Sequence, residues 1–260
     1  MSRLATRFLT AAFVPVFVVL TLFQGQEQPK TSPPPFATAN KHEFPPVMAE
    51  EVFKNVEIMK GHPAGQMLPM MMALRDLLGV DCSYCHTAPE WESGKIKSYP
   101  TTRMMFRMQQ YINTSTFDGK ERVNCWTCHR SEPVPAHSPG PWPPPVTEMI
   151  KKTIELQPED EKKPAEQVFK NIRSFQGMPA GQLPAVMVYL ANSLGVKCGH
   201  CHVKPFSSDE KPEKQRARQM LAMVGGISKN FYGGGNTPVE CYNCHRGQPK
   251  PPEGTSEASR

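Results

Sequence analysis

The feature that most constrains this 260-residue chain is the five-residue pattern Cys-x-x-Cys-His, which occurs four times and uses all eight cysteines. Two cysteines at positions i and i+3 lie on one side of a helical turn, and the histidine follows them directly. This is the attachment pattern for c-type haem, in which both thiols form thioethers and the histidine binds the iron. The sequence therefore predicts four covalently attached haem c groups.

We number the motifs one to four in chain order. The predicted attachment residues are Cys82, Cys85, Cys125, Cys128, Cys198, Cys201, Cys241 and Cys244, and the predicted proximal iron ligands are His86, His129, His202 and His245. The second ring nitrogen of each histidine should donate to a backbone carbonyl or a carboxylate, because such a bond fixes the tautomer of a metal-binding imidazole.

Two other uses of paired cysteines fit the pattern less well. Zinc sites also contain Cys-x-x-Cys pairs, but here a histidine follows every pair. The gap between Cys85 and Cys125 also exceeds the spacing of about 15–20 residues in a zinc ribbon. A redox-active disulfide pair would accompany a βαβ pattern, and this sequence has none.

The N-terminus has the composition of an export signal, with Arg3 and Arg7 ahead of an apolar run from Phe8 to Phe23. We therefore predict a periplasmic protein, and an uncleaved run could anchor it to the inner membrane, because its length approaches the ~20 residues of a membrane span. The formal charge of +6 includes these two arginines, and haem propionates would make the total negative. The charge therefore gives no support for a nucleic-acid partner.

The chain contains an internal repeat with a constant offset of 116 residues: residues 52–56 match 168–172, and motifs one and two match motifs three and four. The predicted fold class is mostly α, with two pseudo-symmetric dihaem helical domains and long Pro-rich connections. The predicted divisions are a signal or anchor at 1–25, a Pro-rich tether at 26–46, dihaem repeat 1 at 47–137, a linker at 138–162, dihaem repeat 2 at 163–250 and a disordered tail at 251–260.

Apolar spacing predicts where the helices of the first repeat lie. One helical pattern starts near Val47 and continues to Met59. A second helix should run from about Gln66 to Leu78 and end at Gly79, and a third should begin near Thr101. The linker should contain a short helix within residues 146–157.

Methionines are the candidates for the second axial iron ligand. Met71 and Met187 each lie eleven residues before the first cysteine of a motif, and no other methionine of that helix recurs in both copies. For motifs two and four, Met105 and Met108 match Met220 and Met223, so the residue pattern alone leaves both members of each pair open. His62 matches Met178, and His137 and His200 have no equivalent ligand in the other copy. All three are predicted to be solvated or hydrogen-bonded.

These stretches resemble the tetrahaem cytochrome c subunit of photosynthetic reaction centres. The resemblance covers about 47–135 and 163–250, and it rests on Val-Phe-Lys-Asn-Val before a Met-bearing helix, on the Met-x-x-Met stretch at 105–108, and on the endings Cys-Trp-Thr-Cys-His-Arg and Cys-Tyr-Asn-Cys-His-Arg-Gly. It implies a near-linear array of haems that donates electrons to the photo-oxidised special pair and is re-reduced by soluble donors. It also implies Met71, Met105, Met187 and Met220 as distal ligands.

The chain departs from that family in three respects. The loop from Asn113 to Asn124 contains no histidine, whereas familiar members supply a second histidine to the fourth haem from this loop. The fourth haem is therefore predicted to have His245 and Met220 as ligands. The lipid-bearing cysteine is absent, and the long insertions that dock such subunits on their partners are not evident.

We predict an electron-relay protein and not an enzyme, because an iron held by both histidine and methionine has no position open for a substrate. The predicted partners are a membrane redox complex of the reaction-centre type and soluble electron donors. Two alternatives are a multihaem reductase or peroxidase, in which the fourth haem has an open site, and one unit of a conductive cytochrome filament.

Overall fold

The computed structural model describes residues 47–154, 156–235 and 237–252, so the predicted signal, the predicted tether and residues 253–260 of the predicted tail lie outside the described residues. The described part of the chain forms helices and no strand, with two isolated bridges at Met48–Pro63 and Pro164–Pro179. This confirms the mostly α fold class. No helix in these ranges is both long enough and apolar enough to cross a membrane.

The same order of elements occurs twice along the chain. The first set is α1 (Ala49–Val52), η2 (Ala64–Gln66), α2 (Met67–Leu78), η3 (Cys82–Tyr84), α3 (Ser98–Phe117) and α4 (Cys125–Cys128). The second set is α6 (Ala165–Val168), η5 (Ala180–Gln182), α7 (Leu183–Leu194), η6 (Cys198–His200), α8 (Pro212–Phe231) and α9 (Cys241–His245). The linker between them holds α5 (Glu148–Thr153) and η4 (Pro158–Asp160).

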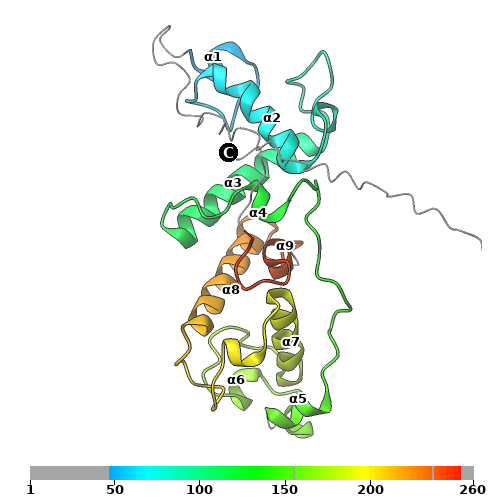
Figure 1. Ribbon diagram of the computed structural model, residues 1–260, viewed down its shortest axis with the longest axis vertical. Coiled ribbons are helices and arrows are strands. Elements are labelled where there is room, and N and C mark those ends of the chain that lie inside the picture. The colour runs from blue at the N-terminus through cyan, green and yellow to red at the C-terminus, as the bar shows by residue number, and fades with distance from the viewer. Residues whose placement is uncertain (1–46, 155, 236, 253–260) are drawn as a thin grey trace, which may run out of the picture.

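The second and fourth motifs meet in the middle of an elongated molecule. Figure 1 shows α1 and α2 at one end, α5, α6 and α7 at the other, and α3, α4, α8 and α9 between them. Helix α4 contacts α9, while α2 contacts α4 and α7 contacts α9. Because α2 leads into the first motif and α7 into the third, the order of the motifs in space is first, second, fourth, third.

Two glycines allow the motifs of each copy to approach each other closely. Gly79 and Gly195 end α2 and α7 with φ of 62° and 61°, a left-handed conformation that favours glycine. A Cβ atom at Gly79 would overlap the carbonyl oxygen of Ser131, and one at Gly195 would overlap that of Gly247. The Ser131 N–H also donates to Leu77 O at 2.9 Å. The chain that leaves one motif therefore packs directly on the helix that leads into its neighbour.

The prediction for the first helix was wrong in its extent. Helix α1 ends at Val52, and Asn55 has a φ of 56°, a left-handed conformation that asparagine tolerates and a helix interior does not. The Ala49 N–H donates to His62 O at 2.8 Å, and the Ala64 N–H donates to Val47 O at 2.8 Å. These backbone bonds fold residues 47–64 back on themselves in place of a continued helix.

The other helix predictions were closer to the structure. Helix α2 ends before Gly79 and α5 lies within 146–157, as predicted. Helix α3 begins at Ser98, not near Thr101, because Pro100 is tolerated within a first helical turn, where a backbone N–H is not needed. The Thr101 hydroxyl donates to Lys97 O at 2.9 Å from inside the helix and does not cap it.

Helices α3 and α8 join the two copies through one closely fitted contact. The rings of Tyr111 and Phe231 lie 5.6 Å apart at an interplanar angle of 65°, and a Cβ atom at Gly226 would overlap the hydroxyl oxygen of Tyr111. Ile112 and Ile227 are buried beside this contact. The missing side chain at Gly226 therefore makes room for the Tyr111 hydroxyl.

We expect Gly226→Ala to destabilise the protein by about 1–2 kcal/mol, because an added methyl group in a filled contact forces its neighbours to move. Thermal unfolding followed by circular dichroism measures the change. Gly225→Ala is the control, since a Cβ atom there meets nothing within 4 Å and alanine favours the helix. Adding Tyr111→Phe to Gly226→Ala should restore most of the loss. Equal stability of the two alanine variants would contradict this account of the interface.

Candidate haem sites

All four motifs form a single helical turn. The backbone N–H of the histidine donates to the carbonyl of the first cysteine at 2.9 Å in motif one, 2.9 Å in motif two and 3.0 Å in motif three, and motif four lies within α9. In motifs two and four, Asn124 and Glu240 start the turn with capping boxes, in which side chains satisfy backbone N–H groups at the start of the turn. Both cysteines of each motif therefore lie on the same side of a turn.

Every predicted proximal histidine uses its Nδ1 atom in the same way. Each Nδ1 lies within hydrogen-bond distance of a backbone carbonyl oxygen that follows the motif: 2.5 Å from His86 to Trp91, 3.0 Å from His129 to Glu132, 3.2 Å from His202 to Phe206 and 3.0 Å from His245 to Gln248. A carbonyl oxygen can only accept, so Nδ1 carries the hydrogen and Nε2 keeps its lone pair. No hydrogen bond to these Nε2 atoms occurs within the described residues.

The environment of three of these histidines favours the neutral imidazole. Burial is the main cause that lowers the pKa of His129, His202 and His245, because desolvation disfavours the charged ring. For His129 the charge of Arg246 acts in the same direction, and for His245 the charge of Arg130 does so. A neutral imidazole with a free Nε2 is the form that binds iron.

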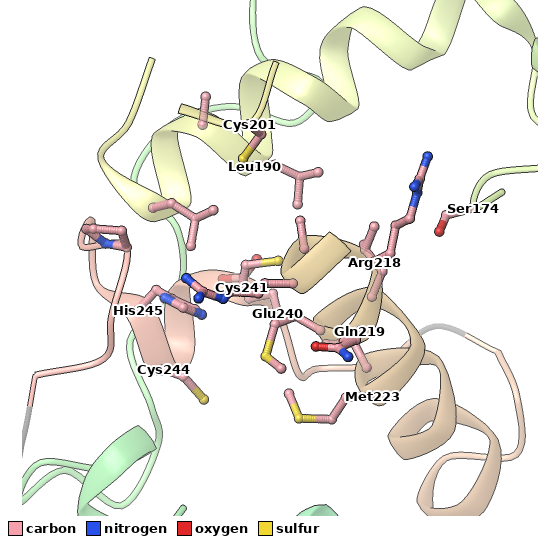
Figure 2. Close-up of a pocket in the computed structure, with 18 of the residues that line it drawn as sticks. Ser174, Leu190, Cys201, Arg218, Gln219, Met223, Glu240, Cys241, Cys244 and His245 are labelled. Carbon is pink, nitrogen blue, oxygen red and sulfur yellow. The ribbon is translucent and has the colours of Figure 1, made fainter. Parts of the chain in front are cut away.

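A cavity of about 2460 Å³ runs through the second copy and reaches the second motif, and it is larger than the roughly 300–1,000 Å³ of an ordinary ligand pocket. Figure 2 shows side chains from α7, α8 and α9, among them Leu190, Met223 and His245, around this cavity. Its lining includes most of the predicted site residues of motifs two, three and four: Cys128, His129, Cys198, Cys201, His202, Cys241, Cys244, His245, Met105, Met187 and Met220.

A smaller cavity of about 620 Å³ lies beside the second motif and is lined by Cys125, His129 and Met105. Met108 lines the large cavity but not this one, whereas Met220 and Met223 both line the large cavity. Met105 therefore lines both cavities and Met108 only the large one, while Met220 and Met223 do not differ in this respect.

The first motif is arranged differently. Neither cavity includes Cys82, Cys85, His86 or Met71, although Met71 lies on α2 ahead of the motif, as the sequence predicts. The His86 ring is instead flanked by Tyr99, in edge contact at 5.2 Å, and by Trp91 at 5.9 Å.

Two features of the site were not predicted from sequence. Arg130 and Arg246, each directly after a predicted ligand, reach across to the motif of the other copy. An arginine follows the histidine only in motifs two and four, and that pattern is the signal that could have revealed them. In addition, Glu240 Oε1 accepts from the backbone N–H of Ser138 at 2.6 Å and lies 3.1 Å from Nδ1 of His137, so Glu240 joins the start of the linker to the fourth motif. The sequence predicted that His137 is solvated or hydrogen-bonded, but not that Glu240 is its partner.

The sequence profile of the family described as "Photosynthetic reaction centre cytochrome C subunit" matches residues 21–148 and 145–259. The chain belongs to this family. It is 27% identical over 253 residues to the photosynthetic reaction center cytochrome c subunit of Thermochromatium tepidum, a match that covers 81% of this chain and 63% of that protein. It is 25% identical over 281 residues to the corresponding subunit of Rubrivivax gelatinosus, covering 89% of this chain and 75% of that protein.

A shorter part of the chain is similar in sequence to a different cytochrome. Cytochrome c-554 of Chloroflexus aurantiacus is 36% identical over 92 residues, which is 32% of this chain and 22% of that protein. The chain thus spans just under two thirds of the Thermochromatium subunit's length and three quarters of the Rubrivivax subunit's length.

We expect Met71→Ala to remove one axial ligand, so that one haem becomes high-spin in the ferric state or its reduction potential falls, because methionine ligation raises the potential. Optical spectra and a redox titration of the purified protein measure both effects. Met72→Ala is the matched control, since Met72 is the next residue on the same helix and is 41% exposed. An unchanged titration of the Met71 variant would rule out this ligand.

For the second haem we expect Met105→Ala to create a high-spin signal and Met108→Ala to leave the spectrum unchanged, because Met105 lines the cavity that also holds Cys125 and His129. Carbon monoxide added to the reduced proteins provides a second measurement, since it binds where an axial position is open. Binding by the Met108 variant and not by the Met105 variant would reverse the assignment.

Proposed function

We propose that the protein is a tetrahaem c-type cytochrome that relays single electrons. The observation that supports this most directly is the shared geometry of the four histidines, each with Nδ1 bound to a carbonyl and Nε2 free. Methionines line the same cavities as three of these histidines. Paired thiols on one turn, a neutral imidazole and a thioether are a donor set that fits haem c.

When bound, haem supplies reversible one-electron chemistry at its iron. The chain would hold each haem through two cysteines, and a histidine and a methionine would bind its iron. The carbonyl that accepts from each Nδ1 fixes the ring orientation and makes the imidazole a better ligand. Two protein ligands at each iron would leave no position for a substrate, so the proposed role is electron transfer and not catalysis.

The proposed path of electrons follows the order of the motifs in space, not in the chain. Motifs two and four are adjacent at the centre, through the contact of α4 with α9, and motifs one and three lie toward opposite ends. Electrons would enter or leave at the first and third haems and cross between copies through the second and fourth.

The named relatives are subunits of photosynthetic reaction centers, which supports a membrane redox complex of that type as the electron acceptor. Soluble donors on the periplasmic side would re-reduce the chain. The N-terminal apolar run, which lies outside the described residues, would direct export and could hold the protein at the membrane.

We expect the protein to co-purify from native membranes with a redox complex, and a light flash to oxidise its haems within those membranes. Absorption changes at the haem α-band measure this oxidation. Membranes that contain the complex but lack this protein are the control. Haems that stay reduced after the flash, in membranes whose special pair is oxidised, would count against a reaction-centre partner.

Carbon monoxide binding to the purified protein distinguishes an electron-relay protein from an enzyme. The reduced wild-type protein should show no spectral change with carbon monoxide, because every iron would have two protein ligands. A response from one haem in the wild-type protein would favour the reductase or peroxidase alternative. Light scattering that shows ordered self-association would favour the filament.

A further inference from the structure

Two arginines occupy equivalent and unusual positions in the central motifs. Arg130 follows His129 and Arg246 follows His245, and both have a φ of 51°. Residues other than glycine rarely adopt this left-handed conformation. The first and third motifs have Thr87 and Val203 at this position, and neither has a positive φ. Among the described residues, an arginine has this unfavourable backbone conformation only where the two copies meet.

Each of these arginines donates a hydrogen bond to the motif of the other copy, and Nε of Arg246 also donates to the carbonyl of Asn243 in its own motif at 3.4 Å. Nη2 of Arg130 donates to the carbonyl of Cys244 at 2.7 Å, and Nη2 of Arg246 donates to the carbonyl of Cys128 at 3.2 Å. Cys128 and Cys244 directly precede the predicted iron ligands, and their sulfurs lie 2.9 Å apart. Each guanidinium therefore contacts the residue that directly precedes the proximal histidine of the opposite motif.

The positive charge of this pair is only partly neutralised. The carboxylate of Glu132 lies 3.5 Å from Arg246, and its side chain is 56% exposed. The Arg246 side chain is 16% exposed, and Nε of Arg130 is buried without a hydrogen-bond partner among the described residues. Charges held in such a place are screened less by solvent and salt than surface charges are.

We propose that Arg130 and Arg246 are crossed positioning residues: each belongs to one central motif and raises the reduction potential of the haem on the other. This rests on the proposed function. Reduction adds one negative charge at the iron, and a nearby cation stabilises that reduced form. The crossed arrangement keeps the second and fourth potentials linked, so that an electron passes between the copies without a large energy difference.

The test compares substitutions that separate charge from hydrogen bonding. Arg130→Gln and Arg246→Gln remove the charge and keep an amide donor, whereas the lysine variants keep the charge and lose the planar guanidinium. Arg75→Gln, an exposed arginine of α2 paired with Asp76, gives the same change in net charge and serves as the control. A redox titration of the purified holoprotein is monitored by electron paramagnetic resonance. The variants Met105→His and Met220→His identify the signals of the second and the fourth haem.

We expect Arg130→Gln to lower the potential of the fourth haem more than that of the second, by about 59 mV, which is a tenfold change in a one-electron equilibrium. Arg246→Gln should lower the second haem more than the fourth. The lysine variants should show the same crossed pattern with smaller shifts, and they supply the test if a glutamine variant fails to fold. Arg75→Gln should shift no potential.

Three results would overturn the proposal: a shift confined to the arginine's own motif, an equal shift at all four haems, or lysine shifts as large as those of glutamine. The last would mean that the pair only joins the two copies mechanically. The titration needs no electron acceptor, so its outcome is independent of the membrane partner. A purified protein without haem would instead refute the proposed function itself.

Discussion

The arrangement of each site depends on one hydrogen bond, from the histidine Nδ1–H to a backbone carbonyl. The acceptors are Glu132 and Gln248 in the central motifs, three residues after the histidine, and Trp91 and Phe206 in the outer motifs, five and four residues after it. The loop after the motif, and not the helix before it, therefore orients the ring.

The described residues contain few fully buried apolar side chains, and Ile227 is the largest of them. The helices instead line two cavities whose walls carry predicted ligands of the second, third and fourth motifs. A chain in which 38% of residues are hydrophobic and 28 are prolines would make a poor conventional core. It fits a fold in which bound apolar groups take the place of side-chain packing.

The sequence predicted those parts of the structure that depend on local chemistry. The end of α2 at Gly79 followed from the left-handed conformation that glycine allows, and the histidine hydrogen bonds followed from how imidazole binds metals. Features that depend on distant parts of the chain were missed. Helix α1 is short because residues 47–49 pair with residues 62–64, and the contacts of Arg130 and Arg246 require two motifs 116 residues apart to touch.

The two copies share equivalent arginine–asparagine contacts, but the charged side chains around these contacts differ. Arg103 on α3 and Arg218 on α8 occupy equivalent positions, and each donates to the backbone carbonyl of the equivalent asparagine, Asn55 or Asn171.

In the first copy the carboxylate of Glu57 pairs with Arg103, but the second copy has Arg173 at the position of Glu57. Asp209 supplies the carboxylate there, and its hydrogen bond from Arg218 is the main cause that holds its pKa well below the usual range. One carboxylate now faces Arg173, Lys214 and Arg218, so cations outnumber it further than in the first copy. Sites that share a ligand pattern need not share a potential, because the charges around that pattern have diverged.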